Sequence, residues 1–170
     1  MAVISPSSSS ARVRLSELER VYNPVLGAYL VWRAAQGHFA EGSHGLLLPL
    51  AYLILPIALH GQSRDALTRT NSGSGLSLFA AKLGNKQEDL LAIHERALAL
   101  RSLSHASITA AAMTNMLYLD PAAAKLLPFD IKPPTPSPDI VKLGNACEKL
   151  GMWLSRMPVE QVASTLRVAF

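Results

Sequence analysis

The chain has 170 residues, enough for one domain with its own hydrophobic core, and its single cysteine, Cys147, excludes an intramolecular disulfide and a cysteine-based zinc site. Apolar residues make up 49% of the sequence and Asp, Glu, Lys and Arg only 16%, compared with about 25% in an average soluble domain, so we expect another subunit, or else uncharged polar side chains, to cover part of the surface. The formal net charge of +4 is not concentrated in a block of Lys or Arg, which argues against a dedicated nucleic-acid-binding protein, and the lone cysteine fits a cytoplasmic location.

Residues 1–14 are predicted to form a flexible tail. They include four consecutive serines, Ser7 to Ser10, and lack an apolar stretch of the length that a secretory signal needs. Arginines in this segment could contact an acidic partner, but we expect a solvated tail. The helical core is therefore predicted to span residues 15–131.

The first predicted helix spans residues 24–36. Asn23 can cap the free backbone amides, and Pro24 suits the first helical position because its missing N–H has no partner there in any case. The helix has almost no polar face, which predicts that it is largely buried. Gly37 is expected to end it.

Residues 46–59 form an uncharged apolar run that contains Pro49 and Pro56. A membrane-spanning helix needs about 20 apolar residues, so this shorter run is more typical of a core or interface helix. An internal proline removes a hydrogen bond and clashes with the preceding turn. We therefore predict one helix that begins near Pro49 and ends or kinks near Pro56.

Residues 60–75 are predicted to contain a short helix between two irregular segments. Gly61 is expected to break the chain, and Ser63 to cap a helix that begins at Arg64. Gly and Ser are frequent in residues 70–75, but the Gly-Lys-Ser or Gly-Lys-Thr of a phosphate-binding loop does not follow. We interpret this segment as a connector.

Two further helices are predicted, over residues 86–103 and 105–116. The first carries the strongest helical periodicity in the chain, and Arg101 would lie in its last turn, where a helix dipole favours a cation. Residues 102–104 are expected to break or cap the chain between them. The small side chains of the second helix would allow a close neighbour.

Residues 117–120 and 125–129 are predicted to be short strands joined by a turn, which gives a β-hairpin. The alternative is a helical turn at residues 122–124, and Pro128 would suit only an edge strand. Two helices followed by a hairpin resemble the outline of a winged helix. The fold class is therefore mainly α, with a short winged-helix-like hairpin.

The C-terminal part is predicted to be a helical pair. Four prolines in residues 132–138 exclude regular hydrogen-bonded structure and indicate a stiff linker. Asp139 is expected to cap a helix that continues to about Arg156, and Pro158 to open a last helix over residues 159–168. The pair, residues 139–170, would pack on the core or on a partner.

The sequence lacks recognisable catalytic motifs. The histidines do not form His-Glu-x-x-His or another compact metal-binding spacing, and no Gly-x-Ser-x-Gly nucleophile elbow is present. We therefore expect a protein that is not an enzyme and has no catalytic residue, cofactor or metal.

Three segments resemble the middle-component family of prokaryotic three-component ABC ATPase systems: residues 23–33 (Asn-Pro-Val-Leu-Gly-Ala-Tyr-Leu-Val-Trp-Arg), 46–60 and 63–67. The similarity is firmest over residues 22–67 and continues more loosely to Asp120. Members of this family resemble one another in structural rather than catalytic residues. They are encoded beside an SMC/Rad50-like ATPase and an effector in anti-phage operons of the Lamassu and Menshen kinds.

The resemblance implies a function as an adaptor. The protein would bridge the ABC ATPase and the effector in a phage or plasmid defence complex, and would contact DNA only through that complex. A subunit between two neighbours needs apolar surface for both, which agrees with the low content of charged residues.

Four residues are candidates for contacts with a partner: Arg64, Trp32, Tyr52 and Trp153. The Arg64 guanidinium can form paired hydrogen bonds with a carboxylate; the alternative is an internal clamp on Asp65 or on a helix end. Aromatic residues dominate binding hot spots, although aromatic side chains at helical spacing are more often part of the core. Trp153 is expected to face a partner because the linker separates its helix from the core.

The alternative function is a winged-helix protein that binds duplex DNA directly. Lys125 and Lys132 at the wing, with Arg96 and Arg101 before it, could contact phosphates. A recognition helix needs several exposed basic or amide side chains, whereas residues 105–116 offer mainly Ala, Ser, Thr and Met. We therefore expect the wing to make protein contacts. A third possibility, membrane association through the apolar run of residues 46–59, is disfavoured by the length of the run and by its prolines.

Overall fold

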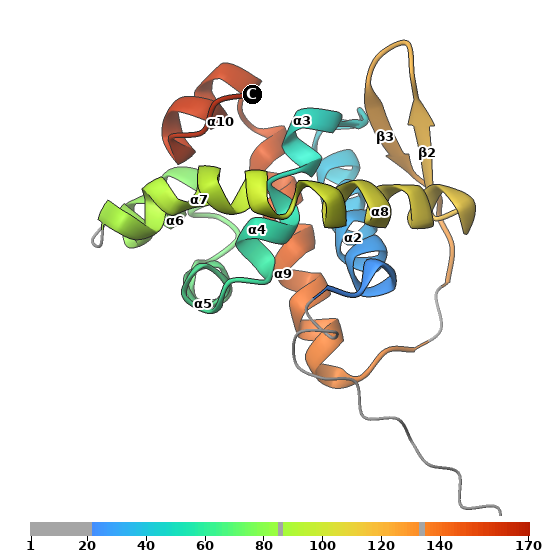
Figure 1. Cartoon of the computed structure of the whole chain (residues 1–170), viewed down its shortest axis with the longest axis horizontal. Helices are drawn as coiled ribbons and strands as arrows, with labels where there is room; N and C mark the ends of the chain where they lie inside the picture. Colours follow the sequence, from blue (N-terminus) through green and yellow to red (C-terminus); the bar gives the residue numbers. More distant parts are fainter. Residues whose placement is uncertain (1–21, 85–86, 133–134) are drawn as a thin grey trace, which may run out of the picture.

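The computed structural model describes residues 22–84, 87–132 and 135–170, so the predicted tail lies outside the described residues (Figure 1). The described chain is mainly α-helical with a small antiparallel sheet, which confirms the predicted fold class. Its elements are α2 (Pro24–Gly42), β1 (Leu46–Leu47), α3 (Leu48–Ala51), α4 (Ile54–Ala58), α5 (Gly61–Arg69), α6 (Gly75–Gly84), α7 (Gln87–Ala99), α8 (Arg101–Met113), β2 (Leu117–Asp120), β3 (Lys125–Pro128), α9 (Pro138–Ser155) and α10 (Val159–Leu166).

Helix α2 begins as the sequence predicts but continues past the expected stop. Asn23 caps it, because its Oδ1 accepts a hydrogen bond from the Val25 amide at 2.9 Å. The helix ends where Ser43 adopts a left-handed conformation, and Gly37 is a buried interior position. Predicting an end at Gly37 was wrong because this glycine serves packing: a Cβ there would lie 1.9 Å from the carbonyl oxygen of Glu148 on α9.

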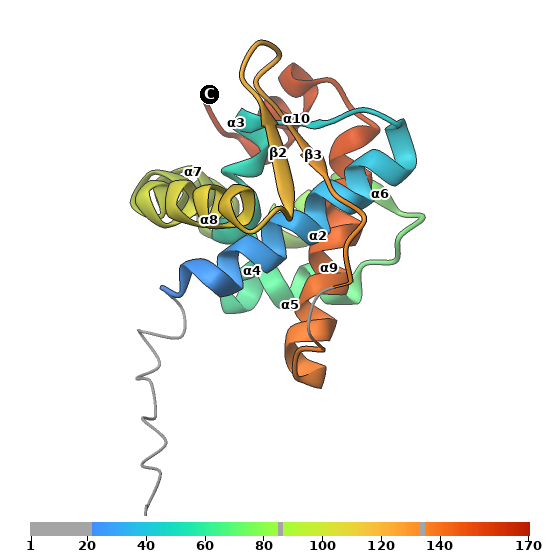
Figure 2. The same cartoon turned by 90° about the vertical axis from the view of Figure 1, so that its right-hand side faces the viewer.

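Helices α2 and α9 form the centre of the fold, and their contact is the most extensive between described elements. Gly151 of α9 faces Ala34 of α2, and a Cβ at residue 151 would lie 1.9 Å from the Ala34 carbonyl oxygen. Without side chains at Gly37 and Gly151, the two backbones come into direct contact. Figure 2 shows the crossing, with α4 and α5 on one side of the pair.

The apolar run is divided differently from the prediction. It contains β1, α3 and α4, and the chain breaks at Tyr52 and Leu53 rather than at Pro56. Pro56 is the third residue of α4, and the amides of a first helical turn have no intrahelical partner. Pro56 therefore lies in the first turn of a helix, where we expected it to end one. All of α4 is buried in the core.

Helix α5 begins three residues before the predicted start, at Gly61 rather than Arg64. The cap is His60, whose Nδ1 accepts a hydrogen bond from the Ser63 amide at 3.4 Å. Ser63 is buried inside the first turn, so it does not cap the helix. Gly61 provides the first helical position instead of a break.

The sequence analysis missed helix α6. Its buried residues are Leu76, Phe79, Ala80 and Leu83, which repeat at three and four positions. This spacing is the signal of an amphipathic helix and could have revealed it. The Gly- and Ser-containing segment before it does connect α5 to α6, as predicted.

Helices α7 and α8 meet at Leu100, earlier than expected. Leu100 belongs to both ends: its amide donates to the Arg96 carbonyl oxygen and its carbonyl oxygen accepts from the Ser104 amide, both at 2.9 Å. Figure 1 accordingly shows the two helices almost end to end. Arg101 is therefore the first residue of α8 rather than part of the last turn of the preceding helix. Residues 102–104 lie inside α8, which packs on α2.

The predicted hairpin is confirmed: β2 and β3 pair antiparallel, with Leu117 opposite Pro128. Strand β1 pairs with the other side of β3, so the order is β1-β3-β2 and β3 is central. Pro128 was expected on an edge strand. Strand β1 pairs with Leu126 and Lys125 and does not reach Pro128, which therefore lacks a neighbour on that side.

The C-terminal helices pack onto the rest of the described chain. Ser137 occupies the cap position of α9, Pro138 is its first residue, and Asp139 lies in the first turn, so the expected cap at Asp139 was wrong. Helix α9 packs on α2, α4, α5 and α6, and α10 packs on α6 and α7. None of the helices within the described ranges combines the length and apolar character needed to cross a membrane.

We predict that Gly151→Ala lowers the free energy of unfolding by at least 1–3 kcal/mol, about the cost of overpacking a core, because the new methyl group would overlap the backbone of α2. Urea unfolding followed by far-ultraviolet circular dichroism measures this change. Gly61→Ala is the matched control, since no atom lies within 4 Å of a Cβ at residue 61. Equal stability of the two variants would contradict close contact between α2 and α9.

Candidate functional site

An apolar groove lies between α3, α7 and the C-terminal residues, with a volume of about 490 Å³. We call it the C-terminal groove. In both views the C-terminus lies close to α3 (Figures 1 and 2). The lining residues are mostly apolar and come from distant parts of the sequence: Leu48, Pro49, Tyr52, Leu53, His94, Ala97, Leu98, Arg101, Ala124, Val168, Ala169 and Phe170.

Local structure determines how these side chains face the groove. Tyr52 lies in the break between α3 and α4, and its hydroxyl is 3.4 Å from Nδ1 of His105. The Ala169 amide donates a hydrogen bond to Nδ1 of His94 at 3.4 Å, which attaches the C-terminal segment to α7. Leu98 and Phe170 are each 55% exposed. The groove therefore presents apolar surface to solvent.

The electrostatic character of the C-terminal groove is simple. Among its lining side chains, Arg101 carries a permanent positive charge and His94 an imidazole, and neither Asp nor Glu is present. Arg101 is exposed at the start of α8. Such a groove can bind an apolar segment that also offers a negative charge.

A second apolar groove of about 490 Å³ lies between α2, the end of α8 and the segment before α9. We call it the α2–α8 groove. Val25 is 72% exposed there. The lining residues are again mostly apolar: Asn23, Val25, Leu26, Ala28, Tyr29, Ala110, Thr114, Met116, Ile131, Lys132, Pro136 and Ile140.

The structure brings together only two of the residues singled out from the sequence. Tyr52 and Arg101 line the C-terminal groove, whereas Lys132 lines the α2–α8 groove. Arg64 is exposed in a polar hollow that also contains Asp139 of α9. Among the described residues its guanidinium forms no hydrogen bond or ion pair, so the internal clamp is absent there.

The two tryptophans lie inside the protein. Trp153 is fully buried, and its indole N–H donates to the Ser72 carbonyl oxygen at 2.8 Å. Trp32 is 2% exposed and donates to the Phe129 carbonyl oxygen at 3.0 Å. The structure thus places Trp153 in the core instead of on a partner-facing surface, because α9 packs against α2 and is not held apart by the linker.

Two of the cations considered for DNA contacts are only partly accessible. Arg96 is half-buried on α7, and its Nη2 donates to the Ser63 hydroxyl at 3.0 Å. Lys125 is half-buried on the central strand, opposite Asp120 of β2.

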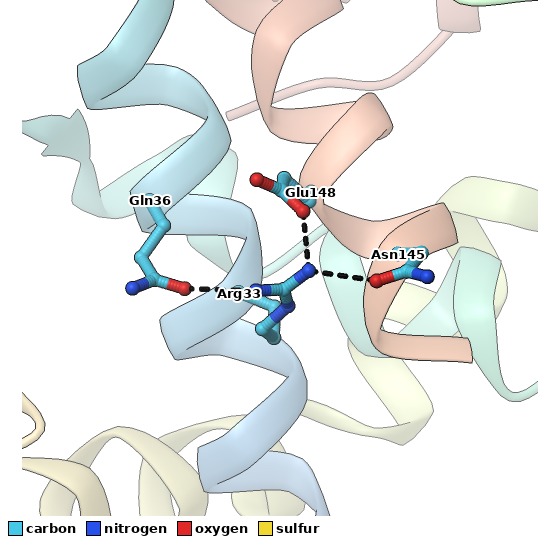
Figure 3. A network of polar contacts seen from close by, with 4 residues as sticks. All are labelled: Arg33, Gln36, Asn145 and Glu148. Atoms are coloured by element: carbon cyan, nitrogen blue, oxygen red, sulfur yellow. Dashed lines mark hydrogen bonds and ion pairs between the residues drawn. The ribbon is translucent and has the colours of Figure 1, made fainter. Parts of the chain in front are cut away.

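Arg33 joins α2 to α9 through a polar network (Figure 3). Its Nη2 donates to Asn145 Oδ1 at 2.7 Å and forms an ion pair with Glu148, while Nη1 donates to Gln36 Oε1 at 3.3 Å. These partners belong to the same chain. The arrangement therefore supports a structural role for Arg33, beside the close approach of the two helices.

Buried titratable groups lie outside the two apolar grooves. Burial raises the pKa of the Cys147 thiol to about 12, although the nearby Arg33 guanidinium acts in the opposite direction. Burial also lowers the pKa of His38, whose Nδ1 lies 3.1 Å from the His44 carbonyl oxygen. Within the described ranges, no group of three or more His, Cys, Asp or Glu side chains could hold a metal ion.

We predict that Cys147 does not react with iodoacetamide in the native protein near pH 8. The thiol is buried, and with a pKa of about 12 only about one part in ten thousand is thiolate. Mass spectrometry after timed labelling should show modification only when urea unfolds the chain. Rapid labelling with an unchanged circular dichroism spectrum would show that α9 does not cover this residue.

Comparison with known proteins identifies the family. The family model described as ABC-three component (ABC-3C) system Middle Component 3 matches residues 11–170, nearly the whole chain. Searches of curated proteins and of solved structures gave no significant match. The match confirms the resemblance of residues 22–67 and extends it through the C-terminal helices. The chain belongs to the Middle Component 3 family of ABC-three component systems.

Proposed function

We propose that this protein is a non-catalytic adaptor that bridges an SMC/Rad50-like ABC ATPase and an effector in a bacterial phage or plasmid defence complex. Membership of a middle-component family supports this function, because a component of such a system has partner subunits. The observation that carries the proposal is the pair of separate apolar grooves. An adaptor needs two surfaces that two partners can occupy at the same time.

The two grooves meet this requirement because they share no lining residue. One uses α3, α7 and the C-terminal residues, and the other uses α2 and the end of α8. Large apolar surfaces on a soluble protein mark interaction sites, and aliphatic and aromatic side chains dominate interface cores. A partner in one groove therefore leaves the lining of the other groove free.

The chemistry of the grooves supports the absence of a catalytic role. His94 is the sole titratable base among the side chains that line the C-terminal groove, and that lining has no Asp, Glu, Ser or Cys to act with it. The α2–α8 groove offers a threonine, a tyrosine and a lysine among mainly aliphatic side chains. Each arrangement suits binding better than nucleophilic or acid–base catalysis.

We predict that the full-length chain, co-expressed with the ATPase and effector of its own system, elutes with both in one complex. Affinity purification through a tag on the ATPase, followed by size-exclusion chromatography, tests this. Omission of this chain should separate the effector from the ATPase. If the ATPase and effector associate without it while it elutes alone, the bridging function fails.

Direct DNA binding is the second candidate, and we predict that it is weak. Arg96 donates to Ser63, and the exposed Arg101 and Lys132 line different grooves, which disfavours a continuous basic surface. Fluorescence anisotropy with a duplex at several salt concentrations measures the binding. A steep loss of affinity with salt, weakened further by Arg101→Glu or Lys132→Glu, would favour the DNA-binding function instead.

A further inference from the structure

We propose that the C-terminal groove binds an amphipathic helix of the ABC ATPase subunit, with the apolar face of that helix in the groove and one of its carboxylates paired with Arg101. This inference rests on the proposed adaptor function and assigns one of its two surfaces. The segment that binds would carry apolar side chains at helical spacing and an Asp or Glu at the edge of its apolar face.

The shape of one groove wall supports a helical occupant. His94, Ala97, Leu98 and Arg101 line the groove at intervals of three and four residues, so they form a single stripe along α7 and the start of α8. Helices α7 and α8 lie almost end to end (Figure 1), so the stripe continues across the joint at Leu100. Side chains arranged in this way pack against another helix laid alongside, in the helix-in-groove mode.

Other lining residues provide anchors for the apolar face. Pro49 and Tyr52 come from α3 and the break after it, and Phe170 comes from the C-terminal segment. Phe170 and Leu98 are each 55% exposed in the isolated chain. Burial of such side chains removes apolar area from water, which drives association.

Charge complementarity argues for a carboxylate in the occupant. The lining side chains include Arg101 and no acid, and Arg101 is exposed. Among the described residues, its guanidinium forms no hydrogen bond or ion pair. A guanidinium binds a carboxylate through two parallel hydrogen bonds. We assign the occupant to the ATPase because the family description names the system after ABC, and the ATPase is the ABC member of the proposed complex.

The test compares exposed variants of the full-length chain for binding to the purified ATPase subunit by biolayer interferometry. Leu98→Glu and Arg101→Glu should each weaken binding at least about tenfold, because they place a carboxylate where the occupant has an apolar or acidic group. Arg101→Lys should retain more affinity than Arg101→Glu. The matched control is Leu91→Glu, since Leu91 is 52% exposed on the same helix and does not line the groove.

The outcomes separate this inference from the adaptor function. Unchanged circular dichroism and melting temperature for the variants, with loss of ATPase binding and retention of effector binding, support it. Equal ATPase binding by wild type, Leu98→Glu and Leu91→Glu overturns the docking site but leaves the adaptor function intact. Loss of effector binding alone, or loss of self-association in sedimentation, shows a different occupant and overturns the assignment. A wild-type chain that binds neither subunit refutes both.

Discussion

The direct contact of two helix backbones at Gly37 and Gly151 is the constraint on which the rest of the structure depends. It places α9, from the end of the sequence, against α2, from the beginning of the described region, and the other elements pack around this pair. Helix α8 and strand β3 contact α2, while α5 and α6 contact α9. The network around Arg33 adds paired polar groups to the same contact. The C-terminal helices are therefore part of the core and not an appendage.

This core also explains much of the low charge. The interior takes up the two tryptophans and all of α4, so an apolar composition does not by itself indicate exposed interface. Some apolar side chains do remain exposed on the described surface, and three of them, Val25, Leu98 and Phe170, line the two grooves. The positions of the proposed interfaces therefore follow from the tertiary fold and could not be deduced from the amino-acid composition.

The sequence predicted elements whose signals are local. Asn23 and Pro24 identified the start of α2, and two short segments on either side of a turn identified the hairpin. Two errors had different causes. Gly37 is used for a long-range contact with α9, whereas Pro56 is tolerated because it falls in the first turn of α4. In the candidate site, Tyr52 and Arg101 were selected for separate reasons, and only the tertiary fold brought them to one groove. No pattern in the sequence indicated that Phe170 and Leu98 would line the same groove.

The short strand β1 connects the hairpin to the wall of the C-terminal groove. The Leu48 amide donates to the Ala124 carbonyl oxygen at 2.8 Å, and both residues line that groove. Ala124 also ends the hairpin turn, in a left-handed conformation. The last residue of the hairpin turn is thus part of the groove lining, so an occupant of the groove would touch the hairpin as well as the helices.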